Sequence, residues 1–298
     1  MDFFAGSLIS GLQLGSIYAL IAIGYSIVYG ILRLINFAHG DLLMVATYGA
    51  WILIARGLSL PFAVIGSVLI TVAFGLVIER AAYRPLRDAG EEATLITSLA
   101  VSIFLQNLFL MVFTPKNRAF ALPGFFSEKL VLGGAGSITI TNMSIVIFVV
   151  TGGLIAAVSL IIKKTRLGIA MRACAENSTA AKLMGVNLNA VVVFAFVVGS
   201  ALAAVAGVLY SGQYVSFNPS MGFMIGIKAF AAAVIGGIGS FAGAAAGGVL
   251  LGVLEILFAC YLPEGAGVYQ TAFVFLVLIV VLLFKPNGLF GAAEGRRS

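Results

Sequence analysis

Charged side chains divide the sequence into long apolar runs. The stretches without a charged residue are residues 3–32, 57–78, 94–115, 130–162, 183–227, 229–254 and 265–284. Most of them reach or exceed the roughly 20 residues that a helix needs to cross the hydrocarbon core of a membrane. Several are long enough to hold more than one crossing, so the pattern predicts a bundle of membrane helices.

This pattern also sets the approximate positions of the helices. We predict them at residues 8–30, 40–55, 60–79, 93–114, 143–162, 189–211, 226–237, 241–260 and 267–284. The stretch 226–237 would rise only about 18 Å as a helix, and GGIGSFAG at 236–243 then interrupts it. It either crosses the membrane or re-enters it as a broken helix, which is tolerated where protein or water covers the freed backbone.

The predicted fold is therefore all-α. We expect a polytopic helical membrane protein with about 8–9 transmembrane helices, forming a single transmembrane domain over residues 1–298. Composition agrees, because 61% of the residues are hydrophobic, only 9% are charged, and the mean hydropathy is +1.15. Soluble domains fall far outside these values. The first apolar stretch lacks a basic start and is expected to remain as a helix.

Lysine and arginine indicate the orientation, because short loops rich in them stay on the cytoplasmic side. If the loop 163–188 is cytoplasmic, 12 of the 17 basic residues are inside. These are Arg33, Arg80, Arg84, Arg87, Lys163, Lys164, Arg166, Arg172, Lys182, Lys285, Arg296 and Arg297. We therefore predict that the N-terminus is outside and the C-terminus inside. The net charge of +6 then reflects this topology and requires no nucleic-acid partner.

Catalytic signatures are missing from the sequence. It has one histidine and no G-x-x-x-x-G-K-[ST], H-E-x-x-H or G-x-S-x-G motif. Cys174 and Cys260 are predicted on opposite sides of the membrane and lack metal-ligand spacing. Acids deep in the bilayer, which mark ion-coupled transporters, are limited to Asp41 and Glu255, each near a predicted helix end. The sequence thus argues against an enzyme and against ATP binding by this chain.

The loop 163–188, KKTRLGIAMRACAENSTAAKLMGVNL, is predicted to form short amphipathic helices. Its apolar residues recur at spacings of three and four, and they are Leu167, Met171, Cys174, Ala180, Leu183 and Met184. Asn177, Ser178 or Thr179 can cap the second helix at its start and Gly185 at its end. Such a helix suits either a groove on another protein or the lipid headgroups.

Several motifs resemble one family of transport proteins. The segment 179–185, TAAKLMG, resembles the coupling helix of permeases from ATP-binding-cassette (ABC) importers, with Thr179 at a position where glutamate is usual. The stretch 11–51 is similar to LivH-type permeases of high-affinity branched-chain amino acid importers. So are NFAHGD (36–41), AAKLMGVN (180–187), IGGIGSFAGAAAGG (235–248) and KPNGLFG (285–291). The resemblance spans nearly the whole chain.

The resemblance implies a complex in the bacterial inner membrane. This chain would pair with a homologous second permease, two ABC ATPase subunits and a periplasmic substrate-binding protein. ATP and magnesium would bind the ATPases, and this chain would hold no cofactor or metal. The coupling residues would be Asn177, Thr179, Ala180, Ala181, Leu183, Met184 and Gly185. Family analogy implies leucine, isoleucine or valine as cargo, although related importers carry urea, short amides or other amino acids.

Polar residues within the apolar runs are candidates for lining the pathway. Asn36, His39 and Asp41 lie in a loop predicted to be cytoplasmic, where they either cap the next helix and bond locally or form an inner gate. The other candidates are Gln13, Ser16, Tyr18, Tyr25, Ser26, Gln106, Asn107, Lys228 and Glu255. The side-chain amides of Gln13, Gln106 and Asn107 either join helices or face the translocation pathway.

Lys228 and Glu255 occupy consecutive predicted helices and pose a separate question. An unpaired charge in lipid is costly, so we expect them either to pair across the hairpin or to reach an interface.

Two other functions stay open on the residues alone. An autonomous secondary transporter or channel would also use broken helices and internal glycines. A non-transporting scaffold would use the loop 163–188 only to dock a partner.

Overall fold

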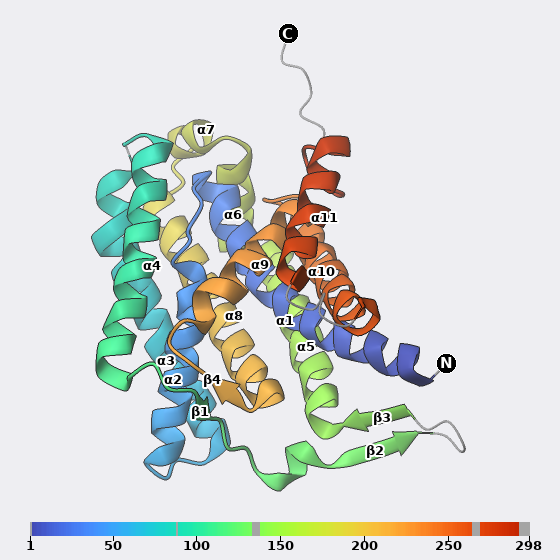
Figure 1. Cartoon of the computed structure of the whole chain (residues 1–298). Helices are drawn as coiled ribbons and strands as arrows, with labels where there is room; N and C mark the ends of the chain where they lie inside the picture. The colour runs from blue at the N-terminus through green and yellow to red at the C-terminus, as the bar shows by residue number, and fades with distance from the viewer. Residues whose placement is uncertain (1, 88, 133–137, 264–268, 292–298) are drawn as a thin grey trace.

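A computed structural model describes residues 2–87, 89–132, 138–263 and 269–291 (Figure 1). Its α-helices are α1 (Asp2–Leu32), α2 (His39–Ala55), α3 (Leu60–Ile78), α4 (Glu91–Phe113), α5 (Asn142–Lys164), α6 (Arg166–Glu176), α7 (Ser178–Leu183), α8 (Leu188–Tyr214), α9 (Met221–Gly236), α10 (Phe241–Tyr261) and α11 (Gln270–Phe284). Each helix predicted from the apolar pattern has a counterpart, and the all-α polytopic class is confirmed. Arg296 and Arg297, predicted to be cytoplasmic, lie outside the described residues.

Within the described residues, six helical segments are long and apolar enough to cross a membrane, and α2, α9 and α11 are shorter apolar helices. The most apolar window of α1 is 89% buried, whereas that of α5 is only 17% buried. The first helix is therefore the central one, packed against α8, α9 and α10. Helices α3, α4 and α5 present apolar side chains outward, as expected where lipid or another membrane protein surrounds them.

Glycines allow α1 and α10 to approach closely. A Cβ atom added at Gly11 would lie 2.8 Å from the Cα of Val253, and one at Gly15 would lie 2.7 Å from the Val249 carbonyl oxygen. Gly11 and Gly15 therefore lie on a face of α1 that packs against α10. Gly243 and Gly247 lie in α10 at the same four-residue spacing, whereas Gly239 precedes α10 in the interhelical turn.

Helix α9 is longer than predicted, starting at Met221 rather than near residue 226. It ends at Gly237, whose φ of +107° suits glycine. The turn that follows is held to α1, because the Ser26 hydroxyl accepts from the Gly239 amide at 2.8 Å and donates to the Ser240 carbonyl at 3.2 Å. At 16 residues, α9 spans about 24 Å, less than the hydrocarbon core.

Two features were absent from the prediction. A π-helical turn (Glu79–Tyr83) and a 3-10 turn (Arg84–Leu86) extend α3. They bring Arg87 onto Glu79 and onto the Asn189 side chain of α8. Short strands β1 (Arg118–Ala119) and β4 (Ser216–Phe217) pair with each other, and β2 (Lys129–Leu132) pairs with β3 (Ile138–Thr141). A 3-10 turn (Gly124–Ser127) precedes β2.

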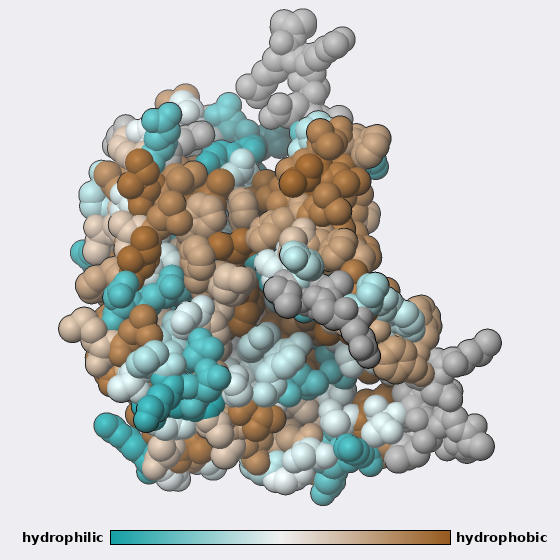
Figure 2. Space-filling view, in the orientation of Figure 1, coloured by the Kyte–Doolittle hydropathy of each residue, from teal (hydrophilic) through white to brown (hydrophobic). Residues whose placement is uncertain are grey.

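The bundle has two distinct ends (Figure 1). The end of α11 lies on the same side as α6 and α7, while the β2–β3 hairpin lies on the opposite side. Figure 2 shows apolar side chains over α11 and polar ones near β1 and β4. Large exposed apolar residues on α11 are Leu276, Ile279, Val280, Leu283 and Phe284.

Candidate functional site

The first candidate site is the pair of short helices at the α7 end of the bundle. Thr165 caps α6 by accepting from the Gly168 amide at 3.0 Å, and Asn177 caps α7 by accepting from the Ala180 amide at 2.9 Å. Gly185 ends α7 with a φ of +84°. The predicted caps at Asn177 and Gly185 are confirmed, whereas Ser178 and Thr179 lie inside α7 rather than capping it.

The apolar residues of this segment divide between two surfaces. Met171, Cys174 and Ala181 are buried in the core. Leu183 and Met184, in contrast, are 84% and 85% exposed, and Ala180 is exposed beside them. The tip of α7 therefore presents apolar side chains to whatever surrounds the protein, while the base of α6 is packed on the bundle. The Arg33 guanidinium, which donates to the Ala175 carbonyl, joins α6 to the end of α1.

The second site is the start of α2, where the prediction that His39 and Asp41 lie in a loop is wrong. His39 and Asp41 are buried in the first turn of α2. The reason is Gly40, which lets α2 approach α9 so closely that an added Cβ would lie 2.6 Å from the Gly226 Cα. The NFAHGD segment is consequently drawn into the bundle.

The capping roles predicted for Asn36 and Asp41 are wrong as well. The N-cap of α2 is Ala38, and no side chain caps it. The Asn36 side chain instead accepts a hydrogen bond from the Tyr83 hydroxyl at 2.7 Å. Its contact with His39 is a backbone hydrogen bond from the His39 amide to the Asn36 carbonyl. Tyr83 belongs to the π-helical turn after α3, so no local sequence pattern indicates this contact.

Asp41 joins α2 to α4. One of its carboxylate oxygens accepts from the Ser102 hydroxyl, and the Gln106 amide donates to the same hydroxyl at 3.0 Å. Ser102 and Gln106 both belong to α4, and Gln106 is linked to Asp41 through the Ser102 hydroxyl, so its predicted role in joining helices directly is not confirmed. Asn107 has no such role within this chain, because it bonds to the Ile103 carbonyl of its own helix at 2.8 Å and is exposed.

Tyr25 and His39 lie beside this cluster. Their rings pack edge to face, with centroids 4.7 Å apart, and Tyr25 also contacts Phe230 of α9. The Tyr25 hydroxyl, the His39 Nε2 and the second carboxylate oxygen of Asp41 are buried without a hydrogen-bond partner among the described residues. Those residues also contain no cluster of three or more potential metal ligands.

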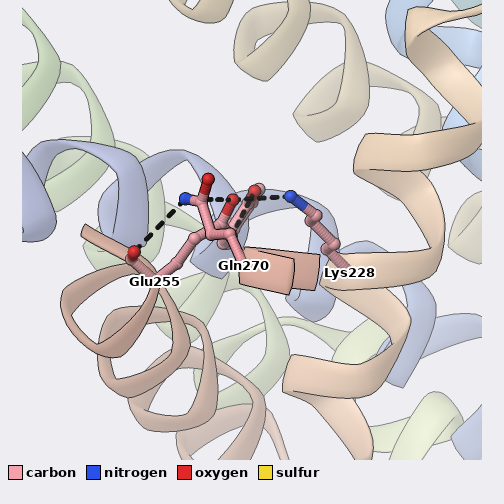
Figure 3. Close-up of polar contacts among 4 residues, drawn as sticks. Lys228, Glu255 and Gln270 are labelled. Carbon is pink, nitrogen blue, oxygen red and sulfur yellow. Dashed lines mark hydrogen bonds and ion pairs between the residues drawn. The ribbon is translucent and has the colours of Figure 1, made fainter. Parts of the chain in front are cut away.

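The third site is an ion pair inside the bundle (Figure 3). The Lys228 ammonium of α9 lies 2.6 Å from a carboxylate oxygen of Glu255 on α10. Tyr18 of α1 donates to the other oxygen at 2.9 Å. The Gln270 amide of α11 donates to the Glu255 backbone carbonyl at 3.2 Å. The predicted pairing of Lys228 with Glu255 is confirmed.

The remaining candidates on α1 are also buried. Gln13 accepts from the Gln213 amide of α8 at 2.9 Å, and Ser16 lies one turn further along, also buried. The sequence reasoning missed Tyr83, Ser102, Gln213 and Gln270. A signal existed for Ser102, because Ser98, Ser102 and Gln106 recur every four residues on an apolar helix and so share one face.

Comparison with known proteins places this arrangement in a family. Residues 7–282 match the family described as "Branched-chain amino acid transport system / permease component". The chain is 43% identical to the high-affinity branched-chain amino acid transport system permease protein LivH of Salmonella typhimurium, over 98% of this chain and 97% of LivH. It is 46% identical to the corresponding permease protein BraD of Pseudomonas aeruginosa, over 96% and 95%.

A solved structure is also similar over most of its length. It is an inward-facing metal-chelate type ABC transporter, with 16% identity, 94% of this chain and 87% of that chain covered, and a TM-score of 0.48. The family match and the two permease relatives cover almost the whole chain, in agreement with its apolar helical bundle. The chain is thus a multi-pass inner-membrane protein that belongs to the permease-component family of branched-chain amino acid ABC transport systems.

Proposed function

We propose that this chain forms half of the translocation pathway of an importer for leucine, isoleucine and valine. The other half is a homologous second permease, two ABC ATPase subunits bind ATP and magnesium, and a periplasmic binding protein delivers the amino acid. The family and the relatives named above, LivH and BraD, support this cargo. The chain itself performs no chemistry and supplies the path and the connection to the ATPases.

The observation that carries the proposal is the exposed apolar tip of α7. Leu183 and Met184 are 84% and 85% exposed at the end of a helix that Asn177 and Gly185 cap on either side. Exposed apolar side chains on a fixed, capped helix are typical of a surface that another protein covers. We assign residues 177–185 as the coupling segment that enters a cleft on the ATPase, within a cytoplasmic loop at 163–188.

The contacts of α6 and α7 provide a route for movement. α6 packs on α1, α5 and α8, and α7 on α8, and the Arg33 guanidinium joins α6 to α1. A displacement of the coupling segment by the ATPases is therefore transmitted to the central helix of the bundle. The polar residues Gln13, Tyr18 and Tyr25 lie on α1, one of the helices that such a displacement reaches.

The first test of the proposed function is to determine the subunit composition of the complex. The chain should be tagged, extracted mildly from its own membrane and analysed by native mass spectrometry. We expect one copy of this chain, one homologous permease and two ATPase subunits. A monomer or homo-oligomer that transports after reconstitution would refute the proposal.

Met184→Glu tests the coupling segment itself. Because Met184 is exposed, we expect the fold to be unchanged but docking to weaken by about tenfold or more, as for a charge placed in an apolar interface core. ATP-driven uptake in proteoliposomes and recovery of the ATPases are measured together. Ile169→Glu, at an exposed apolar position of α6, is the matched control. Equal loss in both variants would favour a headgroup-bound helix instead.

Uptake of labelled solutes then tests the cargo. The reconstituted complex, supplied with its binding protein, should accumulate a branched-chain amino acid on addition of ATP. Accumulation of urea or a short amide instead would agree with a permease role but would show that the proposed cargo is wrong.

A further inference from the structure

An ion pair lies in the middle of the bundle, where a charged group is costly. Tyr18, halfway along the 31-residue helix α1, contacts Glu255 directly. Lys228 lies on α9, a helix of 16 residues that is too short for an untilted crossing. Short or interrupted helices of this kind line the substrate sites of many transporters.

The carboxylate of Glu255 is held from three sides. Tyr18 donates to one oxygen at 2.9 Å, and Lys228 and Gln270 donate to the other at 2.6 Å and 3.4 Å. Four helices thus meet at one side chain, and Figure 3 shows Lys228 and Gln270 reaching it from different directions. Glu255 is therefore fixed in place.

Lys228 is bound less completely. Its ammonium carries three N–H donors, and among the described residues its hydrogen bond goes to Glu255 alone. Its side chain is 14% exposed, compared with 6% for Glu255. Met224 and Ile227, at helical spacing on the same face of α9, are also partly exposed. Lys228, Met224 and Ile227 therefore present an ammonium and apolar side chains at neighbouring positions of α9, each with some exposed surface.

Stability does not require the charges. The helices α9 and α10 already pack closely through Gly236, Gly243 and Gly247, where an added Cβ would clash with backbone atoms. Replacing a buried ion pair by apolar side chains is often neutral or stabilising. The charges consequently call for another explanation.

Transport of an amino acid provides a reason for a buried pair of opposite charges. A branched-chain amino acid is a zwitterion at neutral pH, and its ammonium and carboxylate need counter-charges in a medium of low dielectric constant. The described part of the chain contains two ion pairs. Arg87–Glu79 follows α3 and contacts Asn189 at the start of α8, so only Lys228–Glu255 is positioned inside the bundle.

We propose that Lys228 and Glu255 form a transient binding site for the zwitterionic head of the transported amino acid. The Lys228 ammonium turns from Glu255 to the substrate carboxylate, and the substrate ammonium takes its place on Glu255. The net charge of the site stays unchanged throughout this exchange. Tyr18 and Gln270 keep the Glu255 carboxylate oriented, while Met224 and Ile227 contact the apolar side chain. This inference rests on the proposed function.

The test uses the complete importer complex in nanodiscs without the binding protein. Saturation-transfer difference NMR, which detects weak binding, is recorded with leucine, leucinamide, which lacks the carboxylate, and N-acetylleucine, which lacks the ammonium. Lys228→Met should weaken the leucine signal by about tenfold and leave leucinamide within about twofold. Glu255→Gln should weaken leucine and leucinamide but spare N-acetylleucine. Lys285→Met, at an exposed lysine that follows α11, should change none of them.

The opposite responses to the two analogues separate binding from structure. A parallel loss of all three signals, or no loss in either variant, would overturn the site. If a single variant fails to assemble, Lys228→Met/Glu255→Met removes both charges together. This double variant should assemble, hydrolyse ATP and bind leucine no better than N-acetylleucinamide. A double variant that binds leucine as the wild type does would also refute the inference.

The proposed function fails in a different way. If the wild-type complex with its binding protein imports no branched-chain amino acid, the cargo is wrong whatever the variants do. If the wild type imports leucine and the variants show no analogue dependence, only the zwitterion site is wrong.

Discussion

At the scale of single residues, buried polar side chains hold the helices in register. Asp41 is fully buried, and its carboxylate accepts from Ser102, which also receives the Gln106 amide. In a bundle surrounded by lipid, polar side chains between helices supply specific contacts that apolar packing lacks. The same logic applies to Tyr83 with Asn36 and to Gln213 with Gln13.

Ser102→Ala should destabilise the protein measurably. The substitution removes a donor to a buried carboxylate, and leaving such a group without its partner costs about 1–3 kcal/mol. The midpoint of thermal unfolding in detergent should therefore fall. Ser127→Ala removes an exposed hydroxyl that bonds to a nearby carbonyl and should leave the midpoint unchanged. An equal response in both variants would contradict the assigned contact.

At the scale of elements, backbone contact between helices determines where the polar residues lie. Gly40 of α2 meets Gly222 and Gly226 of α9, and Gly15 of α1 meets Gly252 of α10. These contacts place α9 across the interior and bring His39 and Asp41 inside. Small residues at such crossings let two backbones approach to distances that any side chain would prevent.

Gly40→Ala should disrupt this arrangement. Its Cβ would lie 2.6 Å from both the Gly222 carbonyl oxygen and the Gly226 Cα, and backbone atoms cannot move aside cheaply. We expect loss of stable protein in the membrane, measured by fluorescence-detected size exclusion. Gly152→Ala in α5, where nothing lies within 4 Å of the added Cβ, is the control. It should be neutral or stabilise by about 0.5–1 kcal/mol.

Asn177→Ala tests the cap of α7. Loss of the bond to the Ala180 amide should destabilise this short helix by about 1 kcal/mol. Hydrogen exchange at residues 180–184 should accelerate, and coupling of ATP hydrolysis to uptake should weaken. Ser127→Ala, an exposed substitution outside the coupling segment, should alter neither quantity. Unchanged exchange in Asn177→Ala would show that packing on α8, rather than the cap, orders the segment.

At the scale of the whole molecule, the two ends of the bundle differ in structure. One carries α6, α7 and the end of α11, and the other carries the β2–β3 hairpin (Figure 1). The distribution of lysine and arginine predicts that the first end is cytoplasmic and the second is outside. This assignment, with the N-terminus out and the C-terminus in, remains a prediction.

Labelling with a membrane-impermeant maleimide tests this predicted orientation. Lys129→Cys, in β2, should react in intact spheroplasts, and Leu183→Cys only after the membrane is opened. Both native cysteines are free, and burial raises the pKa of the Cys174 thiol, so this thiol should react slowly at neutral pH. Cys260→Ser removes the remaining background. Labelling of Leu183→Cys from outside would reverse the topology.

The pattern of apolar and charged residues alone established the class of the protein and the approximate positions of most helices. Long charge-free runs leave no alternative to membrane helices, because lipid cannot satisfy exposed backbone groups. Local rules were enough for the Asn177 and Gly185 caps, which depend on neighbours within a few residues. The pairing of Lys228 with Glu255 also followed, because an unpaired charge in lipid is costly.

Tertiary structure decided what depends on helices far apart in the chain. The burial of His39 and Asp41 follows from the contact between Gly40 and Gly226, whose partners no local pattern identifies. The contacts of Glu255 with Tyr18 on α1 and Gln270 on α11 likewise depend on how these helices pack. Apolar periodicity shows that a helix is buried, but only the packing of backbones determines which residues meet inside it.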